Sequence, residues 1–192
     1  MNSLKMTLIA AFCAATYPQM VLANDDALYG AAAPDDAAFV RFIGHTDHPI
    51  APLFNFDFSQ DVTGTDFVVI AAELLSGVEA GTYVTVIVSS DGTVQSIREP
   101  ARDSLSKVNL FLLNATDNDA SLLIAENGAE VIGDVAAGRV GMRAVNPVST
   151  TLSVEDVSFE VSLSRGQDVT FAVLPSGPIM IPTTFGNIVT AD

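Results

Sequence analysis

The segment Val157–Leu163 reads VSFEVSL and alternates apolar with polar side chains at every position. Successive side chains of a β-strand point to opposite faces, so this period of two indicates a strand with one buried face. The same alternation occurs over residues 84–88 and 108–112. Turn signals separate these segments, at Asp91-Gly92, Asn127-Gly128, Arg165-Gly166 and Ser176-Gly177-Pro178. The sequence therefore predicts an all-β protein.

Phe67–Leu75 is the one segment whose periodicity does not decide its structure. It reads FVVIAAELL and is apolar almost throughout. Such a run fits a strand buried on both faces and also fits a short buried helix. Both interpretations stay open at this point.

The chain also resembles itself. Val40–Asp47, VRFIGHTD, aligns with Leu110–Asp117, LFLLNATD, and both are apolar strands running into a Thr-Asp turn. Near the end of each half, Gly81–Val86 matches Gly166–Phe171 in its Gly, Val-Thr and final apolar positions. We interpret these matches as a structural repeat.

A polar, proline-containing stretch around Pro100 separates the two halves and is typical of a linker. We expect an all-β fold of two small antiparallel β-sandwich domains in tandem, joined by that short linker. The predicted boundaries are 39–98 for the first sandwich, 99–106 for the linker and 107–192 for the second sandwich.

Residues 1–23 have the pattern of a secretory signal peptide. Lys5 is the lone charge, an apolar run follows, and Val21-Leu22-Ala23 supplies small residues for cleavage after Ala23. The run is shorter than the ~20 residues of a membrane span. We expect an exported, periplasmic protein whose only cysteine, Cys13, is removed with the signal.

Residues 24–38 are rich in Ala and Asp and show no alternation. One interpretation is an unstructured tail. The other is an extended N-terminal docking segment, with Leu28 and Tyr29 as apolar anchors against a partner or the first sandwich.

The chain is strongly acidic, with 8 Lys and Arg against 23 Asp and Glu. Removing Lys5 from the net charge of −15 leaves −16 on the mature chain. Nucleic-acid binding depends on basic residues, so this charge argues against it. It also opposes long-range attraction to a polyanion and favours protein partners.

Residues suited to catalysis are few. His45 and His48 could bind a metal together with Asp47, but Thr46-Asp47 and Pro49 are turn residues, and we favour a plain hairpin loop. Neither histidine has the Asp-x-x-His context of a serine esterase. The Ser104-x-x-Lys107 pattern runs into a strand and lacks its partner motifs. We therefore predict no catalytic residues, no metal and no cofactor.

A carbohydrate-binding surface is the main alternative. Such surfaces stack sugars on exposed aromatic rings, but the chain has no tryptophan, and only Tyr29 and Tyr83 lie outside the signal. Arg98, Arg102 and Lys107 cluster in sequence, and their simplest interpretation is a solvated linker.

Several short motifs, in order along the chain, resemble the family of the alginate O-acetylation protein AlgF. They are Asp26-Ala27-Leu28-Tyr29-Gly30, Ala33-Pro34, Phe39-Val40-Arg41, Glu99-Pro100, Asn114, Arg143-Ala144-Val145-Asn146-Pro147-Val148 and Arg165-Gly166. The resemblance covers nearly the whole mature chain.

The resemblance implies a non-catalytic periplasmic adaptor required for O-acetylation of alginate. Its implied partners are a membrane-bound O-acyltransferase and periplasmic acetyltransferases of serine-esterase fold, with alginate as a further candidate. The predicted partner contacts are Leu28, Tyr29, Arg41, Arg143 and Asn146. The alternatives are a module that holds the polysaccharide, and an acetyltransferase or esterase that depends on His45 or His48.

Overall fold

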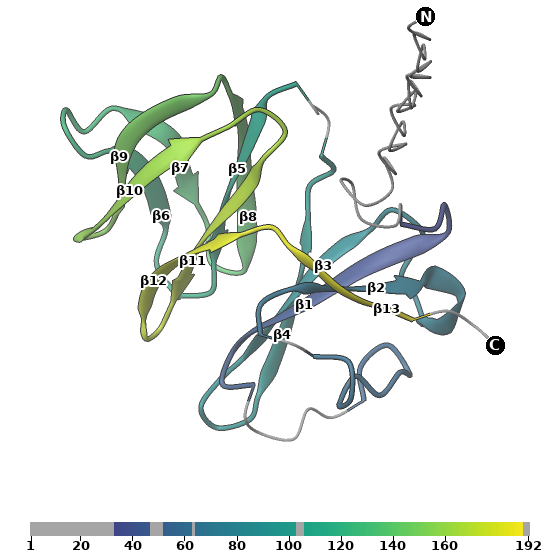
Figure 1. Ribbon diagram of the computed structural model, residues 1–192. Helices are drawn as coiled ribbons and strands as arrows, with labels where there is room; N and C mark the ends of the chain where they lie inside the picture. Colours follow the sequence, from purple (N-terminus) through teal and green to yellow (C-terminus); the bar gives the residue numbers. More distant parts are fainter. Residues whose placement is uncertain (1–32, 47–51, 63, 103–105, 190–192) are drawn as a thin grey trace, which may run out of the picture. The chain divides into compact units, whose positions relative to one another are not determined.

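Three β-sheets make up the part of the chain that the computed structural model describes, residues 33–46, 52–62, 64–102 and 106–189 (Figure 1). These residues contain one short 3-10 helix besides their strands. None of their helical segments is long and apolar enough to cross a membrane. The prediction of an all-β fold is confirmed.

The first half of the chain forms a five-stranded N-terminal sheet of order β13-β2-β1-β3-β4. Its strands are β1 (Ala37–Gly44), β2 (Phe67–Ala71), β3 (Tyr83–Val88), β4 (Val94–Glu99) and β13 (Phe185–Val189). A 3-10 helix, η2 (Ala72–Leu74), follows β2 directly. The ambiguous segment FVVIAAELL is therefore a buried strand followed by one tight helical turn.

The second half forms two four-stranded sheets. The inner sheet has the order β12-β11-β5-β8, and the outer sheet has the order β10-β9-β6-β7. The inner strands are β5 (Val108–Asn114), β8 (Arg139–Val145), β11 (Asp168–Leu174) and β12 (Gly177–Pro182). The outer strands are β6 (Ala120–Ile124), β7 (Glu130–Val135), β9 (Val148–Val154) and β10 (Val157–Leu163). The two sheets form a sandwich around one apolar core. The inner sheet contributes Leu112 and Phe171 to this core, and the outer sheet contributes Leu122 and Leu152.

The strand pairing confirms the repeat inferred from sequence. The order β2-β1-β3-β4 in the N-terminal sheet is matched by β8-β5-β11-β12 in the inner sheet. The registers agree as well, since Val40 pairs with Val84 and Leu110 pairs with Val169, the positions that the sequence alignment makes equivalent. Both central pairs are parallel, a feature that the expected antiparallel sandwiches did not include. In each half a long crossover connects the two paired strands, and a crossover permits parallel pairing.

The central strands are buried on both faces. In β1, Ala38, Val40 and Phe42 point into the core of the first half. The next residue, Ile43, points the other way and joins a separate apolar cluster with Leu113 of β5. Burial on both faces explains why the alternation inferred for residues 84–88 and 108–112 is incomplete, with the apolar residues Ile87 and Phe111 on the second face. The two repeats therefore pack against each other through equivalent faces.

The C-terminal strand belongs to the first half. β13 runs parallel to β2, with Ile188 opposite Val69, and the hydroxyl of Thr184 bonds the carboxylate of Asp66. The first half is thus a single sheet completed by the end of the chain, and residues 185–189 lie outside the sandwich to which the range 107–192 assigned them. Residues 33–192 form one compact unit.

We predict that Gly44→Ala destabilises the protein more than Gly92→Ala does. Both glycines have positive φ, +102° and +81°, but a Cβ on Gly44 would lie 2.3 Å from the carbonyl oxygen of Val88, whereas one on Gly92 meets nothing within 4 Å. Backbone strain alone costs ~1–2 kcal/mol, and the overpacking at Gly44 adds about 1–3 kcal/mol. Urea unfolding of both variants measures the difference, and equal losses of stability would contradict the clash.

Candidate functional site

A buried network of charged and hydroxyl side chains joins the two repeats. Arg41, in the middle of β1, is completely buried. Its Nη2 donates to Oε1 of Glu99 at 2.7 Å and to the hydroxyl of Thr170 in β11 at 2.7 Å. Its Nε donates to the hydroxyl of Thr85 at 2.8 Å, and that hydroxyl donates to Glu99. Thr85 and Thr170 are equivalent positions of the two repeats, so Arg41 bonds to both halves at once.

Glu99 stands at the centre of this network and bonds two arginines. Its Oε1 faces Arg41, and its Oε2 accepts a hydrogen bond from Nη2 of Arg102 at 2.7 Å. Burial by itself raises the pKa of Glu99, but the charges of Arg41 and Arg102 outweigh burial, and the pKa lies below its usual range. Burial lowers the pKa of Arg41, against the opposing charge of Glu99. Glu99 is therefore a carboxylate held ionised by its neighbours.

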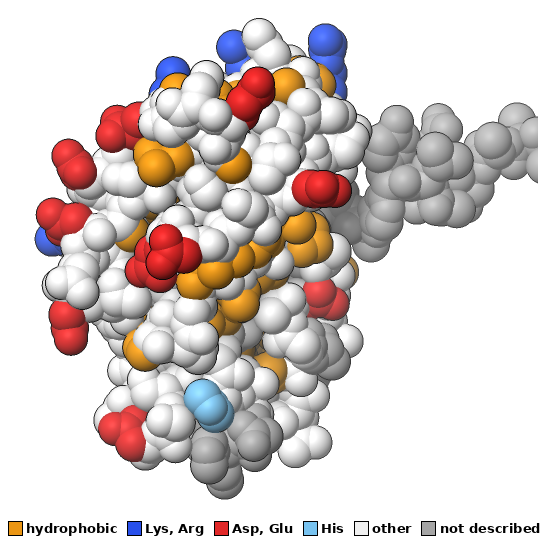
Figure 2. Space-filling model, turned by 90° about the vertical axis from the view of Figure 1, so that its left-hand side faces the viewer, with side chains coloured by type: hydrophobic (Ala, Val, Ile, Leu, Met, Phe, Trp, Pro, Cys, Tyr) orange, Lys and Arg blue, Asp and Glu red, His pale blue; other side chains and the backbone are white. Residues whose placement is uncertain are grey.

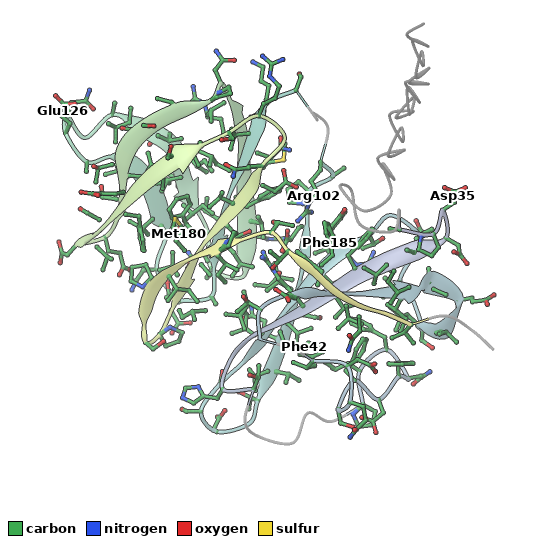
Figure 3. All side chains as sticks on the ribbon, in the orientation of Figure 1. Asp35, Phe42, Arg102, Glu126, Met180 and Phe185 are labelled. Atoms are coloured by element: carbon green, nitrogen blue, oxygen red, sulfur yellow. The ribbon has the colours of Figure 1, made fainter. Side chains whose placement is uncertain are left out.

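Arg102 extends the network along the connection between β4 and β5. Its Nε donates to Asp168 of β11 at 3.1 Å. Its guanidinium lies 3.4 Å from the ring centroid of Tyr83 and 4.7 Å from that of Phe111, which belong to different halves. The guanidinium also lies 5.4 Å from the ring centroid of Phe67 in β2, and Arg102 is labelled in Figure 3. Cation–π contacts of a desolvated guanidinium are worth about 2 kcal/mol. Arg102 therefore stabilises the contact between the two repeats through both ion pairs and cation–π interactions.

These positions correct two sequence predictions. Arg41 was expected to contact a partner, but its burial and its internal hydrogen bonds give it no exposed surface for such a contact. Arg102 was expected in a solvated linker, yet its side chain is only 8 % exposed. Sequence reasoning missed four residues of the network. Glu99 and Asp168 lie at strand ends, and Thr85 and Thr170 lie inside apolar strands. A charge or hydroxyl inside a strand buried on both faces is the signal that could have identified them.

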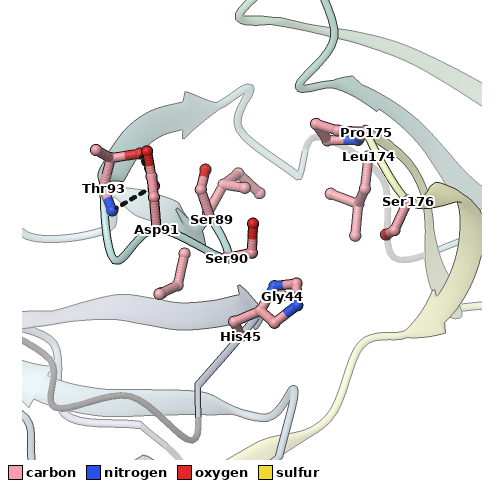
Figure 4. Close-up of a pocket in the computed structure, with 11 residues that line it drawn as sticks. Gly44, His45, Ser89, Ser90, Asp91, Thr93, Leu174, Pro175 and Ser176 are labelled. Carbon is pink, nitrogen blue, oxygen red and sulfur yellow. Dashed lines mark hydrogen bonds between the residues drawn. The ribbon is translucent and has the colours of Figure 1, made fainter.

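His45 lines an open pocket of about 470 Å³ at the end of β1. Figure 4 shows Ser89 and Ser90 on one side of His45 and Ser176 on the other. The carboxylate of Asp91 accepts hydrogen bonds from the backbone N–H of Thr93 at 2.9 Å and from its hydroxyl at 2.7 Å. Asp91 is thus engaged within its own turn, and the pocket gathers hydroxyl groups around one imidazole.

Arg143 and Asn146 are exposed, as a partner contact requires. Arg143 lies on β8 and donates through Nη1 to the carbonyl of Val131 at 2.9 Å. Asn146 lies in the short turn between β8 and β9. The structure brings these two residues to one end of the inner sheet, while Arg41 lies in the buried network and does not share their surface.

Five residues singled out in the sequence lie outside the described part of the chain: Leu28, Tyr29, Asp47, His48 and Ser104. Within the described part, no group of three or more histidine, cysteine or acidic residues is arranged to hold a metal ion.

Acidic side chains are scattered over one face of the described structure. The face drawn in Figure 2 carries red carboxylates on both sides of an oblique apolar band, with most of its Lys and Arg side chains at the upper end. On this face the carboxylates are distributed rather than gathered into one acidic site.

The fold and the network define a class: an all-β protein of two repeated halves, fastened by a buried ion-pair cluster. A family model described as "Alginate O-acetyl transferase AlgF" matches residues 11–172. The chain belongs to the AlgF family, and the resemblance inferred from its short motifs is confirmed.

Individual relatives agree with this assignment. The alginate biosynthesis protein AlgF of Pseudomonas fluorescens is 30% identical over 179 residues, which cover 83% of this chain and 82% of that protein. The AlgF of Pseudomonas aeruginosa is 29% identical over 189 residues, covering 88% of each. A solved structure of the C-terminal domain of AlgF from P. aeruginosa covers 40% of this chain and 98% of that domain, with 29% identity and a TM-score of 0.37.

We predict that Glu99→Gln destabilises the protein by about 3–5 kcal/mol, because it leaves two buried guanidinium groups without their shared counter-charge. Chemical denaturation measures the loss. Glu126→Gln, at an exposed turn, is the matched control and should change stability by less than about 0.5 kcal/mol. A loss at Glu99 no larger than the control's would refute the role given to the network.

The same carboxylate predicts an acid-sensitive step in stability. Because the folded pKa of Glu99 lies below its usual value of 4.5, the contribution of this carboxylate to stability is complete above that value and is lost as pH falls through the folded pKa. Melting curves between pH 7 and pH 3 should therefore show a smaller acid-dependent loss in Glu99→Gln than in the wild type. Parallel pH profiles of the two proteins would count against this assignment.

Proposed function

We propose that this protein is a non-catalytic periplasmic adaptor in the O-acetylation of alginate. Its relatives are named alginate biosynthesis proteins, and its family is described as an alginate O-acetyl transferase family. The signal-like residues 1–23, with cleavage after Ala23, support export to the periplasm. The proposed partners are a membrane-bound O-acyltransferase and periplasmic acetyltransferases of serine-esterase fold.

The observation that carries this proposal is that the buried charged side chains bond one another rather than face a substrate. Arg41, Glu99 and Arg102 bond one another and both repeats, and are at most 8 % exposed at their side chains. General acid–base chemistry requires groups within reach of a substrate. These groups instead fix two β-structures into one unit, which suits a protein that holds partners at defined positions.

The proposed contacts are Leu28 and Tyr29 in the N-terminal segment, with Arg143 and Asn146 at the end of the inner sheet. Apolar and aromatic anchors supply most of the energy of such interfaces, while exposed polar residues around them set orientation. The strong negative charge supports protein partners over an anionic polymer, since like charges repel at long range.

The direct test is a pull-down with the mature chain from periplasmic and membrane extracts, followed by identification of the bound proteins. Recovery of a membrane O-acyltransferase or an acetyltransferase of serine-esterase fold supports the proposal. Retention on an alginate column, without any such protein, would replace the adaptor by the polysaccharide-binding alternative.

We predict that the double variant Leu28→Ala/Tyr29→Ala abolishes alginate acetylation in cells and leaves the melting temperature unchanged. The reason is loss of the two apolar anchors of the docking segment. Val157→Ala/Met180→Ala removes two exposed apolar side chains elsewhere and serves as the matched control, expected to retain acetylation. Acetylation that persists in the first variant would refute docking through Leu28 and Tyr29.

One observation favours a second candidate, direct handling of an acetyl ester at the pocket beside His45. That pocket places hydroxyl groups of Ser89, Ser90 and Ser176 around an imidazole. This function predicts turnover of an acetyl ester such as p-nitrophenyl acetate that His45→Ala reduces by about 10²–10⁴-fold, the usual contribution of a general base. The adaptor proposal predicts equal background rates in both proteins, and a stopped absorbance assay distinguishes them.

A further inference from the structure

β13 is the one edge strand of the described sheets that carries neither a charge nor a proline. An edge strand exposes unpaired backbone N–H and C=O groups, and charged side chains or prolines along it prevent unwanted pairing. Of the other edge strands, β4, β7, β8 and β10 each carry at least one charged residue, and β12 carries Pro178 and Pro182. β13 reads FGNIV, and within the described chain no strand pairs with its outer side (Figure 1). This edge is therefore open to an additional strand.

Two large apolar side chains of β13 are exposed on one face of the sheet. Phe185 is 53 % exposed and Ile188 is 46 % exposed. Phe185 lies opposite Phe67 and Ile188 lies opposite Val69, so a register shift, typical of a β-bulge, falls between them. Phe67 and Val69 belong to one apolar cluster on the same face of β2. The shift thus turns both exposed side chains toward that face, where the Phe185 ring also lies 5.6 Å from the ring centroid of Phe39.

Carboxylates flank both ends of this edge. At the start of β13, the partly exposed Asp66 accepts a hydrogen bond from the hydroxyl of Thr184. At its end, Val189 lies opposite Ile70, and the exposed Glu73 follows in η2, directly after β2. Carboxylates at these positions complement Lys or Arg side chains.

An open pocket of about 360 Å³ adjoins Phe185 where β12 passes into β13. Gln167 and Pro182, both exposed, line it together with the Phe185 ring. The pocket provides space for a side chain at one end of an added strand.

We propose that the free edge of β13 binds an extended, basic segment of a protein partner. The backbone of that segment pairs with β13, its apolar side chains cover Phe185 and Ile188, and its Lys or Arg side chains approach the flanking carboxylates. Strand addition draws affinity from main-chain hydrogen bonds and specificity from alternate side chains. The inference rests on the proposed adaptor function and deepens it, because it names the kind of partner segment that one surface takes.

Charge and backbone chemistry decide between the possible occupants. The chain carries a net charge of −15, which attracts a basic segment and repels a second copy, an acidic segment or a polyuronate at long range. A polyuronate also has no row of amide N–H and C=O groups to pair with a strand edge. A basic polypeptide therefore fits this edge best.

The test is a nuclear magnetic resonance titration of the full mature chain with a capped peptide of about eight residues, within the usual length of a strand. The peptide alternates lysine with valine, and its control alternates glutamate with valine. The lysine peptide should shift the amide signals of Asn187 and Ile188. The glutamate peptide should bind at least about tenfold more weakly, because like charges placed together are costly.

Two double variants separate the edge from general charge effects. Phe185→Lys/Ile188→Lys places charges on the edge and should weaken binding of the lysine peptide by at least about tenfold. Val148→Lys/Val157→Lys makes the same replacement at two exposed apolar residues of the outer sheet and should leave the affinity within about twofold. Circular dichroism checks folding, and Ile188→Lys alone, which keeps the ring contacts of Phe185, replaces the double variant if that variant unfolds.

The inference is overturned if the lysine peptide does not bind, if the glutamate peptide binds as tightly, or if the edge variant binds as tightly as its control. It is also overturned if the same β13 signals shift when the protein alone is concentrated, since the occupant would then be a second copy. A failed titration with intact partner capture in the pull-down removes the edge site and leaves the adaptor proposal standing. A failed pull-down removes the adaptor proposal independently of the titration.

Discussion

The carboxylate of Glu99 is the group on which the arrangement of the two repeats depends. It lies in a site that excludes water, and it is stable there as an anion because Arg41 and Arg102 reach it from two directions. Each arginine also reaches the opposite half, at Thr170 or Asp168. Removing one member of a buried ionic cluster leaves the other charges buried without a partner, which strongly destabilises the folded protein. The cluster therefore stabilises the fold only when all its members are present. This all-or-none property ties the alignment of the repeats to one acidic side chain.

The two repeats are alike in pairing but different where they meet. Arg41 in the first half corresponds to Phe111 in the second, and the register places Glu99 at the position of Thr183. The charged side of the contact comes mainly from the first half, and the aromatic surface under Arg102 comes from both. Two copies of either half alone would bring like charges or unmatched apolar faces together. The contact is therefore specific for one first half against one second half.

Sequence reasoning reached the strands, the repeat and the family, but only part of the site. Alternation identified β10, and the matched motifs gave the equivalence of β1 with β5, because both signals are local in the chain. Arg41 was placed on the surface because a charge is usually exposed, whereas its partners lie 44, 58 and 129 residues away. The pairing of β13 with β2 was missed for the same reason, since no local pattern states which edge the last strand completes.

The position of β13 has a consequence for how the chain acquires its structure. The N-terminal sheet is finished only when residues 185–189 arrive at the edge of β2, almost at the end of the chain. A polypeptide that emerges N-terminus first exposes that edge during the whole passage of the second half. Contacts of such large sequence separation form slowly, and an unpaired edge is a template for wrong partners until then. Because the chain is synthesised from its N-terminus, the exposed edge of β2 is protected from incorrect strand pairing only after β13 has emerged.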